Sequence, residues 1–260
     1  ASILKSLDNV DVIFHLADVN AKEASISPEN AIKTNGIGTF NLLQAANQKR
    51  INKFVYFSTI NVYGDALTGN VSELTLPLPK HPYGITSRLA EDFVLQKNLG
   101  NMACIVLRLS NVVGSPISKN IKCWHLIAND LCRQAIEYKM LNVNSNPNIE
   151  RDFVSLKALL KTCLEIIKID NNNAIWQNIF NISSGTCLSL KSLARLIAKQ
   201  SNYLFPSNHT NIQFLSNISN NMNRYVINSD KAKQHGLLKD ESLIDDINDL
   251  LIECDRWFKK

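Results

Sequence analysis

The chain has 260 residues, of which 45% are hydrophobic and 20% charged, so it can bury a core and is too apolar for a disordered or fibrous protein. The net charge of +5 is spread along the sequence; it suits an anionic small molecule but forms no basic stripe for nucleic acid. No apolar run approaches the roughly 20 residues of a membrane span. The six cysteines lack metal-ligand spacing, so we expect reduced thiols in a cytoplasmic protein and no metal site.

The first half of the chain alternates strands and helices. Dense apolar runs predict buried strands at 11–17, 53–58 and 103–109, and helical periodicity predicts helices at 31–46 and 83–97. This alternation is typical of an α/β protein with a doubly wound, Rossmann-like parallel sheet. The Gly-rich turn that opens a dinucleotide-binding domain is absent, because Gly36 is the first glycine. We therefore expect the N-terminal βαβ unit to be missing, either because the chain is a fragment of a longer protein or because it is a functional short form.

Beyond residue 111 the pattern predicts a smaller mixed domain. Helices are expected at 122–138, 156–169, 188–200 and 243–258, strands at 149–154, 179–182 and 212–215, and loop through most of 201–223. We predict a partial dinucleotide-binding domain formed by 1–111 with 151–180. A substrate-binding domain would comprise 112–150 and 181–260.

Two hydroxyl side chains are expected near the carboxyl ends of the strands, where parallel sheets bind their ligands. Thr59 directly follows the strand predicted at 53–58, and Tyr83 opens the next helix after Pro82, a residue that favours a helix start. A hydroxyl at a strand tip that faces a phenol can hold a substrate alcohol or carbonyl for proton transfer. Thr and Tyr residues at the ends of strands and helices more often have a structural role. A functional role for Thr59 and Tyr83 is therefore supported only by the sequence motifs around them.

Several short stretches follow one another in a recognisable order. They are His15–Ala17, Asn35–Leu43, Phe57–Gly64, Pro82–Gly84 with Glu91, Arg108–Gly114, Arg151–Val154, Phe180–Gly185, and Arg224 before Asp230–Ala232. With them the chain resembles the extended short-chain dehydrogenase/reductases, in the NAD-dependent epimerase/dehydratase family that acts on nucleotide sugars. The resemblance covers nearly the whole chain.

The resemblance implies a reversible hydride transfer between a sugar carbon and NAD or NADP. In such a reaction, Tyr83 would be the acid and base that exchanges a proton with the sugar oxygen, and Thr59 would form a hydrogen bond with that oxygen. The cofactor would be lined by Leu16, Ala17, Asn35, Ser58, Tyr83 and Ser87, and the nucleotide sugar by Asn111, Arg151 and Arg224. Family members commonly dimerise through two helices of each subunit, one of which carries the Tyr. The resemblance therefore suggests a homodimer interface at Phe93, Val94 and Lys97, although the same residues fit the core of the chain equally well.

One departure bears on catalysis. The family carries Lys four residues after the Tyr, where this chain has Ser87, and Arg88 is rotated about 100° around the helix. Without an ammonium group the pKa of Tyr83 should lie nearer ~10, which leaves about one phenolate in a thousand at neutral pH. The sequence therefore also fits a catalytically impaired relative that acts as a binding or scaffold protein.

A second departure bears on the reaction type. Dehydratases of the family place Asp and Glu directly after the active hydroxyl residue, and these positions here are Ile60 and Asn61. Neither side chain transfers protons, which disfavours dehydration. A 4-epimerase-like reaction or the reduction of a keto-sugar fits better.

Overall fold

A computed structural model describes residues 2–65, 67–96, 101–215 and 224–259. They divide into two compact units. Unit 1 comprises Ala1–Ser110, Cys163–Ile182 and Asn228–Leu237, and unit 2 comprises Asn111–Thr162, Ser183–Ile227 and Leu238–Lys260. Within the described ranges, every helix is too short or too polar to cross a bilayer.

Unit 1 is built on a parallel four-stranded sheet. Its strands β1 (Val12–His15), β2 (Lys53–Thr59), β4 (Ala103–Leu109) and β8 (Asn178–Ile182) are adjacent in that order, and all neighbours are parallel. The apolar runs predicted these strands because both faces of the sheet are covered, so nearly every residue of β2 and β4 is buried. The expected α/β fold is confirmed.

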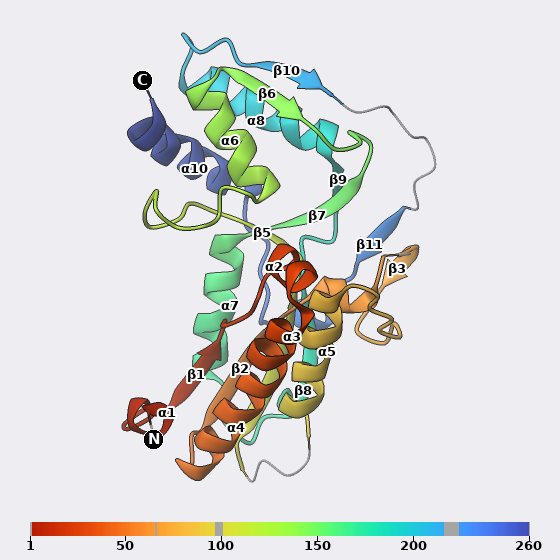
Figure 1. The fold of residues 1–260 in the computed structure, drawn as a ribbon, viewed down its shortest axis with the longest axis vertical. Coiled ribbons are helices and arrows are strands. Elements are labelled where there is room, and N and C mark those ends of the chain that lie inside the picture. Colours follow the sequence, from red (N-terminus) through yellow and green to blue (C-terminus); the bar gives the residue numbers. More distant parts are fainter. Residues whose placement is uncertain (1, 66, 97–100, 216–223, 260) are drawn as a thin grey trace. The chain divides into compact units, whose positions relative to one another are not determined.

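Two helices lie side by side along one face of this sheet (Figure 1). They are α4 (Thr39–Gln48) and α5 (Pro82–Val94). Leu43 of α4 and Ala90 and Val94 of α5 pack against Phe54 and Tyr56 of β2. Because alternate strand residues point to opposite faces, Val55 and Lys53 face the other way. The remaining local elements of unit 1 are α1 (Ser2–Ser6), α2 (Ala21–Ile26), α3 (Pro28–Ala31), the π-helix η1 (Ile32–Gly38), the 3-10 helix η2 (Ile60–Tyr63), β3 (Gly69–Val71) and α9 (Asp230–Gln234).

The second face of the sheet meets the end of α7 (Leu156–Lys168). The Lys53 ammonium donates to the carbonyl oxygens of Ile166 and Ile167, at 3.4 and 2.6 Å, and lies 5.7 Å from the ring centre of Trp176. A cation at a helix C-terminus satisfies free carbonyls and the helix dipole. Lys53 can therefore be buried without a carboxylate partner, because the carbonyl oxygens at the end of α7 accept its hydrogen bonds.

Unit 2 contains a mixed sheet of β5 (Asn111–Val113), β7 (Glu150–Ser155) and β9 (Cys187–Ser189), with β7 in the middle. A second, parallel pair joins β6 (Met140–Val143) and β10 (Asn211–Phe214). Helices α6 (Ile127–Glu137), α8 (Leu190–Leu204) and α10 (Leu243–Phe258) share one apolar core, and β11 (Tyr225–Ile227) completes the described strands.

The unit boundaries differ from the predicted domains in two segments. Residues 151–162 belong to unit 2, because β7 pairs with β5 and β9 and not with the four-stranded sheet. Residues 228–237 belong to unit 1, because α9 packs against β8 and its Lys231 donates to Asn178 and to the Ile179 carbonyl at the start of that strand, at 2.9 Å each. Strand pairing between distant segments sets these boundaries.

A buried ionic network anchors α5 to the sheet. Glu91 of α5 is fully buried, and its carboxylate accepts from Arg108 Nε at 2.9 Å, from Arg108 Nη2 at 2.7 Å and from Ser58 Oγ at 2.6 Å. The guanidinium of Arg108 also lies 4.7 Å from the ring centre of Tyr63. These bonds join α5 to β2 and β4 and fix the helix above the strand ends.

Removing the carboxylate of this network should destabilise the fold strongly. We expect Glu91→Ala to lower the free energy of unfolding by about 3–5 kcal/mol, because the Arg108 charge is then buried without a partner. The control is Glu29→Ala, which breaks the exposed ion pair with Lys33 and should cost less than about 1 kcal/mol. Urea denaturation measures both, and similar losses in the two variants would contradict the anchoring role.

Candidate active site

The side chains of Thr59 and Tyr83 meet at the carboxyl end of the sheet in unit 1. Thr59 is the last residue of β2 and is buried, and Tyr83 lies in the first turn of α5. The Thr59 hydroxyl lies close enough to the Tyr83 phenol to lower its pKa. The Thr59 oxygen already accepts from the backbone and side-chain nitrogens of Asn61, at 3.2 and 2.8 Å, so its proton is left for the phenol oxygen.

Local sequence explains why Tyr83 stands at this place. His81 caps α5: its Nδ1 accepts from the Tyr83 backbone at 3.2 Å, and its Nε2 pairs with Ser25 Oγ at 2.6 Å. Pro82 is the first helical residue. A Cβ atom on Gly84 would lie 2.6 Å from the backbone oxygen of Asn61, so only glycine lets the helix start approach the end of β2 this closely.

The loop after β1 is tied to α5 by a buried amide. Asn35, in the π-helix η1, accepts from the Val19 backbone at 2.8 Å and donates to Thr86 Oγ1 at 2.9 Å. π-helical turns often occur at functional sites, and here the turn carries an amide that is completely buried. The bond to Val19 fixes the neighbouring Asp18 beside α5.

A polar cluster surrounds the hydroxyl of Ser87, one helical turn after Tyr83. Ser87 Oγ donates to the Tyr83 carbonyl at 2.9 Å and to Asp18 Oδ2 at a longer 3.4 Å, and the Tyr56 hydroxyl faces it from β2. Asp18 Oδ1 is buried and has no hydrogen-bond partner among the described residues. The position that carries an ammonium in the family thus lies beside a carboxyl group.

Burial and charge raise the pKa values of this cluster. Burial raises the pKa of Asp18 to about 7, against the effect of hydrogen bonds from Val19 and Ser87. Burial also raises the pKa of Tyr83 above its ordinary value, and the charge of Asp18 raises it further, while the hydrogen bond with Thr59 opposes the change. Tyr83 is therefore a phenol, and not a phenolate, near neutral pH.

The residues expected to line the cofactor play two different parts. Leu16 and Ala17 follow β1 and are exposed at the strand end, where a ligand can reach them. The polar groups of Asn35, Ser58 and Ser87 bind protein partners instead, so these side chains support the site from behind. The buried Asp18 Oδ1 and Ser110 Oγ, both without partners among the described residues, leave polar atoms that a dinucleotide's hydroxyl and amide groups can satisfy. The site residues in unit 1 fit such a cofactor.

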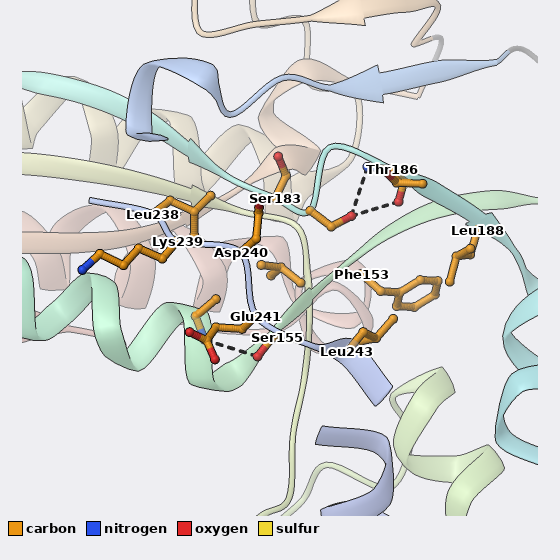
Figure 2. A pocket seen from close by; sticks show the side chains of 13 residues that line it. Phe153, Ser155, Ser183, Thr186, Leu188, Leu238, Lys239, Asp240, Glu241 and Leu243 are labelled. Atoms are coloured by element: carbon orange, nitrogen blue, oxygen red, sulfur yellow. Dashed lines mark hydrogen bonds between the residues drawn. The ribbon is translucent and has the colours of Figure 1, made fainter. Parts of the chain in front are cut away.

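The residues expected to bind the substrate lie in unit 2. Asn111 donates to the Asp152 carbonyl at 2.8 Å, and Arg151 and Arg224 are exposed. Unit 2 also holds a cavity of about 310 Å³, in which the apolar side chains of Phe153, Leu188 and Leu243 gather on one side (Figure 2). None of the three expected substrate residues lines this cavity.

Three residues of the site were missed by sequence reasoning. Asp18 follows an apolar strand and carries no motif, His81 directly precedes Pro82, and Tyr56 has the pattern of an ordinary strand residue. A signal existed for His81, because a polar residue before Pro at a helix start is a capping pattern. The role of Asp18 depends on the contact with Ser87, 69 residues away, which no local pattern reveals.

Comparisons with known proteins identify the family of the chain. The model of the NAD dependent epimerase/dehydratase family matches residues 1–183, so the chain belongs to that family. It is 25% identical over 236 residues to the UDP-glucose 4-epimerase of Rhizobium leguminosarum bv. trifolii, covering 85% of this chain and 70% of the relative. It is 27% identical to the GDP-6-deoxy-D-mannose reductase of Pseudomonas aeruginosa, covering 72% of this chain and 62% of the relative.

Solved structures share the fold. The UDP-glucuronic acid 4-epimerase of Bacillus cereus, in complex with UDP-glucuronic acid and NAD, superposes with a TM-score of 0.80 at 21% identity. The match covers 98% of this chain and 79% of that protein. The Rossmann-like architecture of the chain is thereby confirmed, and the chain is shorter than each of these three proteins.

The raised pKa of Asp18 predicts how stability depends on pH. The folded state holds the Asp18 proton more tightly than the unfolded chain, so this contribution is complete below about pH 4 and is lost as the pH rises through about 7. Asp18→Asn should therefore stabilise the protein more at pH 8.5 than at pH 5, by at most about 3 kcal/mol.

Urea denaturation at the two pH values measures this difference. The control is Asp11→Asn, which removes an exposed carboxylate just before β1. An equal gain at both pH values, or the same response in the two variants, would show that folding does not raise the pKa of Asp18.

Proposed function

We propose that the chain is an NAD(P)-dependent nucleotide-sugar epimerase, with a 4-epimerase-like reaction, or a keto-sugar reductase. Tyr83 is the residue that exchanges a proton with the sugar oxygen, and Thr59 holds the same oxygen. The observation that carries the proposal is that the Thr59 hydroxyl lies close to the Tyr83 phenol at the carboxyl end of β2, where parallel sheets bind their ligands. Membership of the family and the names of the relatives support it.

The chain's own residues have distinct tasks in this proposal. Thr59 donates to the oxygen that Tyr83 also contacts, which orients a sugar hydroxyl or carbonyl for proton transfer. Leu16 and Ala17 form an open wall at the end of β1 for the cofactor, which supplies or accepts the hydride when bound. In unit 2, Arg151 and Arg224 would grip the diphosphate, because a planar guanidinium suits phosphate oxygens.

Ile60 and Asn61 argue against dehydration at this site. The side chain of Asn61 donates to Thr59, and that of Ile60 carries no titratable group. Loss of water from a sugar needs an acid and a base beside the active hydroxyl. Epimerisation and carbonyl reduction need only the Thr59–Tyr83 pair and the nicotinamide.

A second candidate function is a binding or scaffold role without turnover. Ser87 favours it, because the buried serine supplies no positive charge that would lower the pKa of Tyr83. In this case we expect Ser87→Lys, in a chain extended by the N-terminal Gly-rich βαβ unit, to gain cofactor affinity, since an ammonium group beside Asp18 and Tyr83 would add charge and hydrogen-bond donors. Isothermal titration calorimetry with NAD measures the change, and tight NAD binding by the unaltered chain would speak against this candidate.

The proposal also includes a homodimer formed through α5. Ile85 and Leu89 are exposed on this helix, whereas Val94 is fully buried and Phe93 packs on Phe40 with ring centres 5.0 Å apart. Lys97, the third residue expected at the seam, lies outside the described residues. Light scattering should give twice the chain mass, and Ile85→Glu should reduce it to one.

Turnover on a panel of nucleotide sugars tests the proposed reaction. The chain is incubated with NAD or NADP and with UDP-, GDP- and dTDP-sugars, and products are separated by chromatography. We expect conversion of at least one sugar and a loss of 10²-fold or more in Tyr83→Phe, which removes the transferable proton and keeps the ring. Activity that survives in Tyr83→Phe, or no conversion above that variant on any sugar, would refute the proposal.

A further inference from the structure

The side chain of Tyr83 packs against residues of two short helices, α2 and α3, and of the loop before them. Val19, Ala24 and Ala31 form a small buried apolar cluster, and Tyr83 packs against this cluster. Ala24 and Ala31 are completely buried. Because close packing holds a side chain in one rotamer, the cluster limits the positions that the phenol oxygen can take.

A histidine joins α2 to the first turn of α5. The His81 carbonyl accepts from the Ile85 backbone at 3.0 Å, and His81 Nδ1 accepts from the Tyr83 backbone at 3.2 Å. On the other side of the ring, Nε2 lies 2.6 Å from the hydroxyl oxygen of Ser25 in α2. His81 therefore closes the first turn of α5 and also ties this turn to α2, next to the Ala24 contact with Tyr83.

The hydrogen bonds of His81 define which ring nitrogen carries the proton. A ring nitrogen that accepts a hydrogen bond has no proton, so Nδ1 is unprotonated, and the proton of the neutral imidazole is on Nε2. Nε2 therefore donates to the hydroxyl oxygen of Ser25. The Ser25 hydrogen is in turn donated to the Ala21 carbonyl within α2, at 3.1 Å. Each donor in this series has its own acceptor, which fixes the orientation of the imidazole between the two helices.

The helix α2 is also continuous with the loop that we expect to line the cofactor. Leu16 and Ala17 are exposed in this loop. Asn20, at its end, caps α2 by accepting from the Glu23 backbone at 3.1 Å. A displacement of α2 would therefore change both the loop and the packing of Tyr83.

We propose that His81 and Ser25 are positioning residues for the reaction: their hydrogen bond ties the first turn of α5 to α2 and so holds the Tyr83 phenol where it exchanges a proton with the sugar oxygen. The inference rests on the proposed function and adds to it two residues that act through Tyr83. Displacing a reacting group by about 1 Å can lower a rate about 10²-fold, so a bond that contributes little to stability can have a large effect on turnover.

Nuclear magnetic resonance of the chain without cofactor, at pH 8, tests the hydrogen bonds of the imidazole. In protein labelled with nitrogen-15, His81 is assigned among the five histidines by its loss in His81→Asn. Its Nε2 should carry the proton, and its Nδ1 should show a scalar coupling to the Tyr83 amide nitrogen across the hydrogen bond. A proton on Nδ1 would overturn the proposal.

Two variants break the bond between the helices from opposite ends. Ser25→Ala removes the acceptor, and His81→Asn removes the imidazole but keeps a residue that caps helices well. The control is Ser27→Ala, which removes the hydroxyl that accepts from the Asn30 backbone at 3.3 Å in the next helix. The carbon-13 signal of the Tyr83 ζ position should shift in the first two variants and stay in place in the control. A Tyr83 signal that is the same in all three would contradict the inference.

Kinetics on a nucleotide sugar that the chain converts tests the effect on the reaction. Ser25→Ala and His81→Asn should each lower kcat at least about fivefold and change the KM of the sugar less than about twofold, because Tyr83 acts on the reacting oxygen. The two changes together should cost no more than the larger single loss, since both remove one bond. Ser27→Ala should keep the kcat of the wild type. Losses that multiply in the double variant, or a change in KM alone, would refute the positioning role.

The two kinds of measurement separate this inference from the function on which it rests. If the wild-type chain converts no sugar while the Tyr83 signal responds as expected, the proposed function is refuted and the positioning of the phenol by α2 is supported. If the chain converts a sugar and kcat is the same in Ser25→Ala and His81→Asn as in the wild type, the function is supported and the inference is refuted.

Discussion

The buried pair of Glu91 and Arg108 sets the position on which the site depends. It joins the middle of α5 to two strands of the sheet, with a serine hydroxyl as a third partner for the carboxylate. Because both charges are almost completely removed from water, the helix cannot slide or rotate without separating them. The first turn of α5 therefore stays above the end of β2, where Tyr83 meets Thr59.

Local contacts at the start of α5 position the Tyr83 side chain. Gly84 lets the helix approach Asn61, and His81 closes the first turn. One turn further along, the position at which the family carries a lysine is Ser87, whose hydroxyl lies 3.4 Å from Asp18 Oδ2. The family fold is present, and Thr59 and Tyr83 lie at the ends of adjacent elements. A serine and a carboxyl group thus lie where the family places an ammonium group.

Much of the fold was predictable because its signals are local. The strands at 53–59 and 103–109 appear as apolar runs, since a parallel sheet covered on both faces buries almost every side chain. The helix at 243–258 was predicted at its observed bounds from its apolar stripe. The helix expected at 31–46 begins with the π-helix η1, in which Asn35 and Gly36 are buried, and continues as α4. Strands β3, β5, β6, β9 and β11 were missed, because each is only three or four residues long.

The sequence by itself determined the fold class, the family resemblance and the two residues, Thr59 and Tyr83, at the ends of adjacent elements. These features depend on hydrophobic periodicity and on short motifs in a fixed order, which can be recognised in the sequence alone. Only the tertiary structure decided that Asp18 lies beside Ser87, that Asn35 supports the loop after β1, and that residues 151–162 belong with unit 2. Contacts between residues tens of positions apart arise from the packing of strands and helices. The pKa of a buried group depends on the burial, charges and hydrogen bonds that these contacts create.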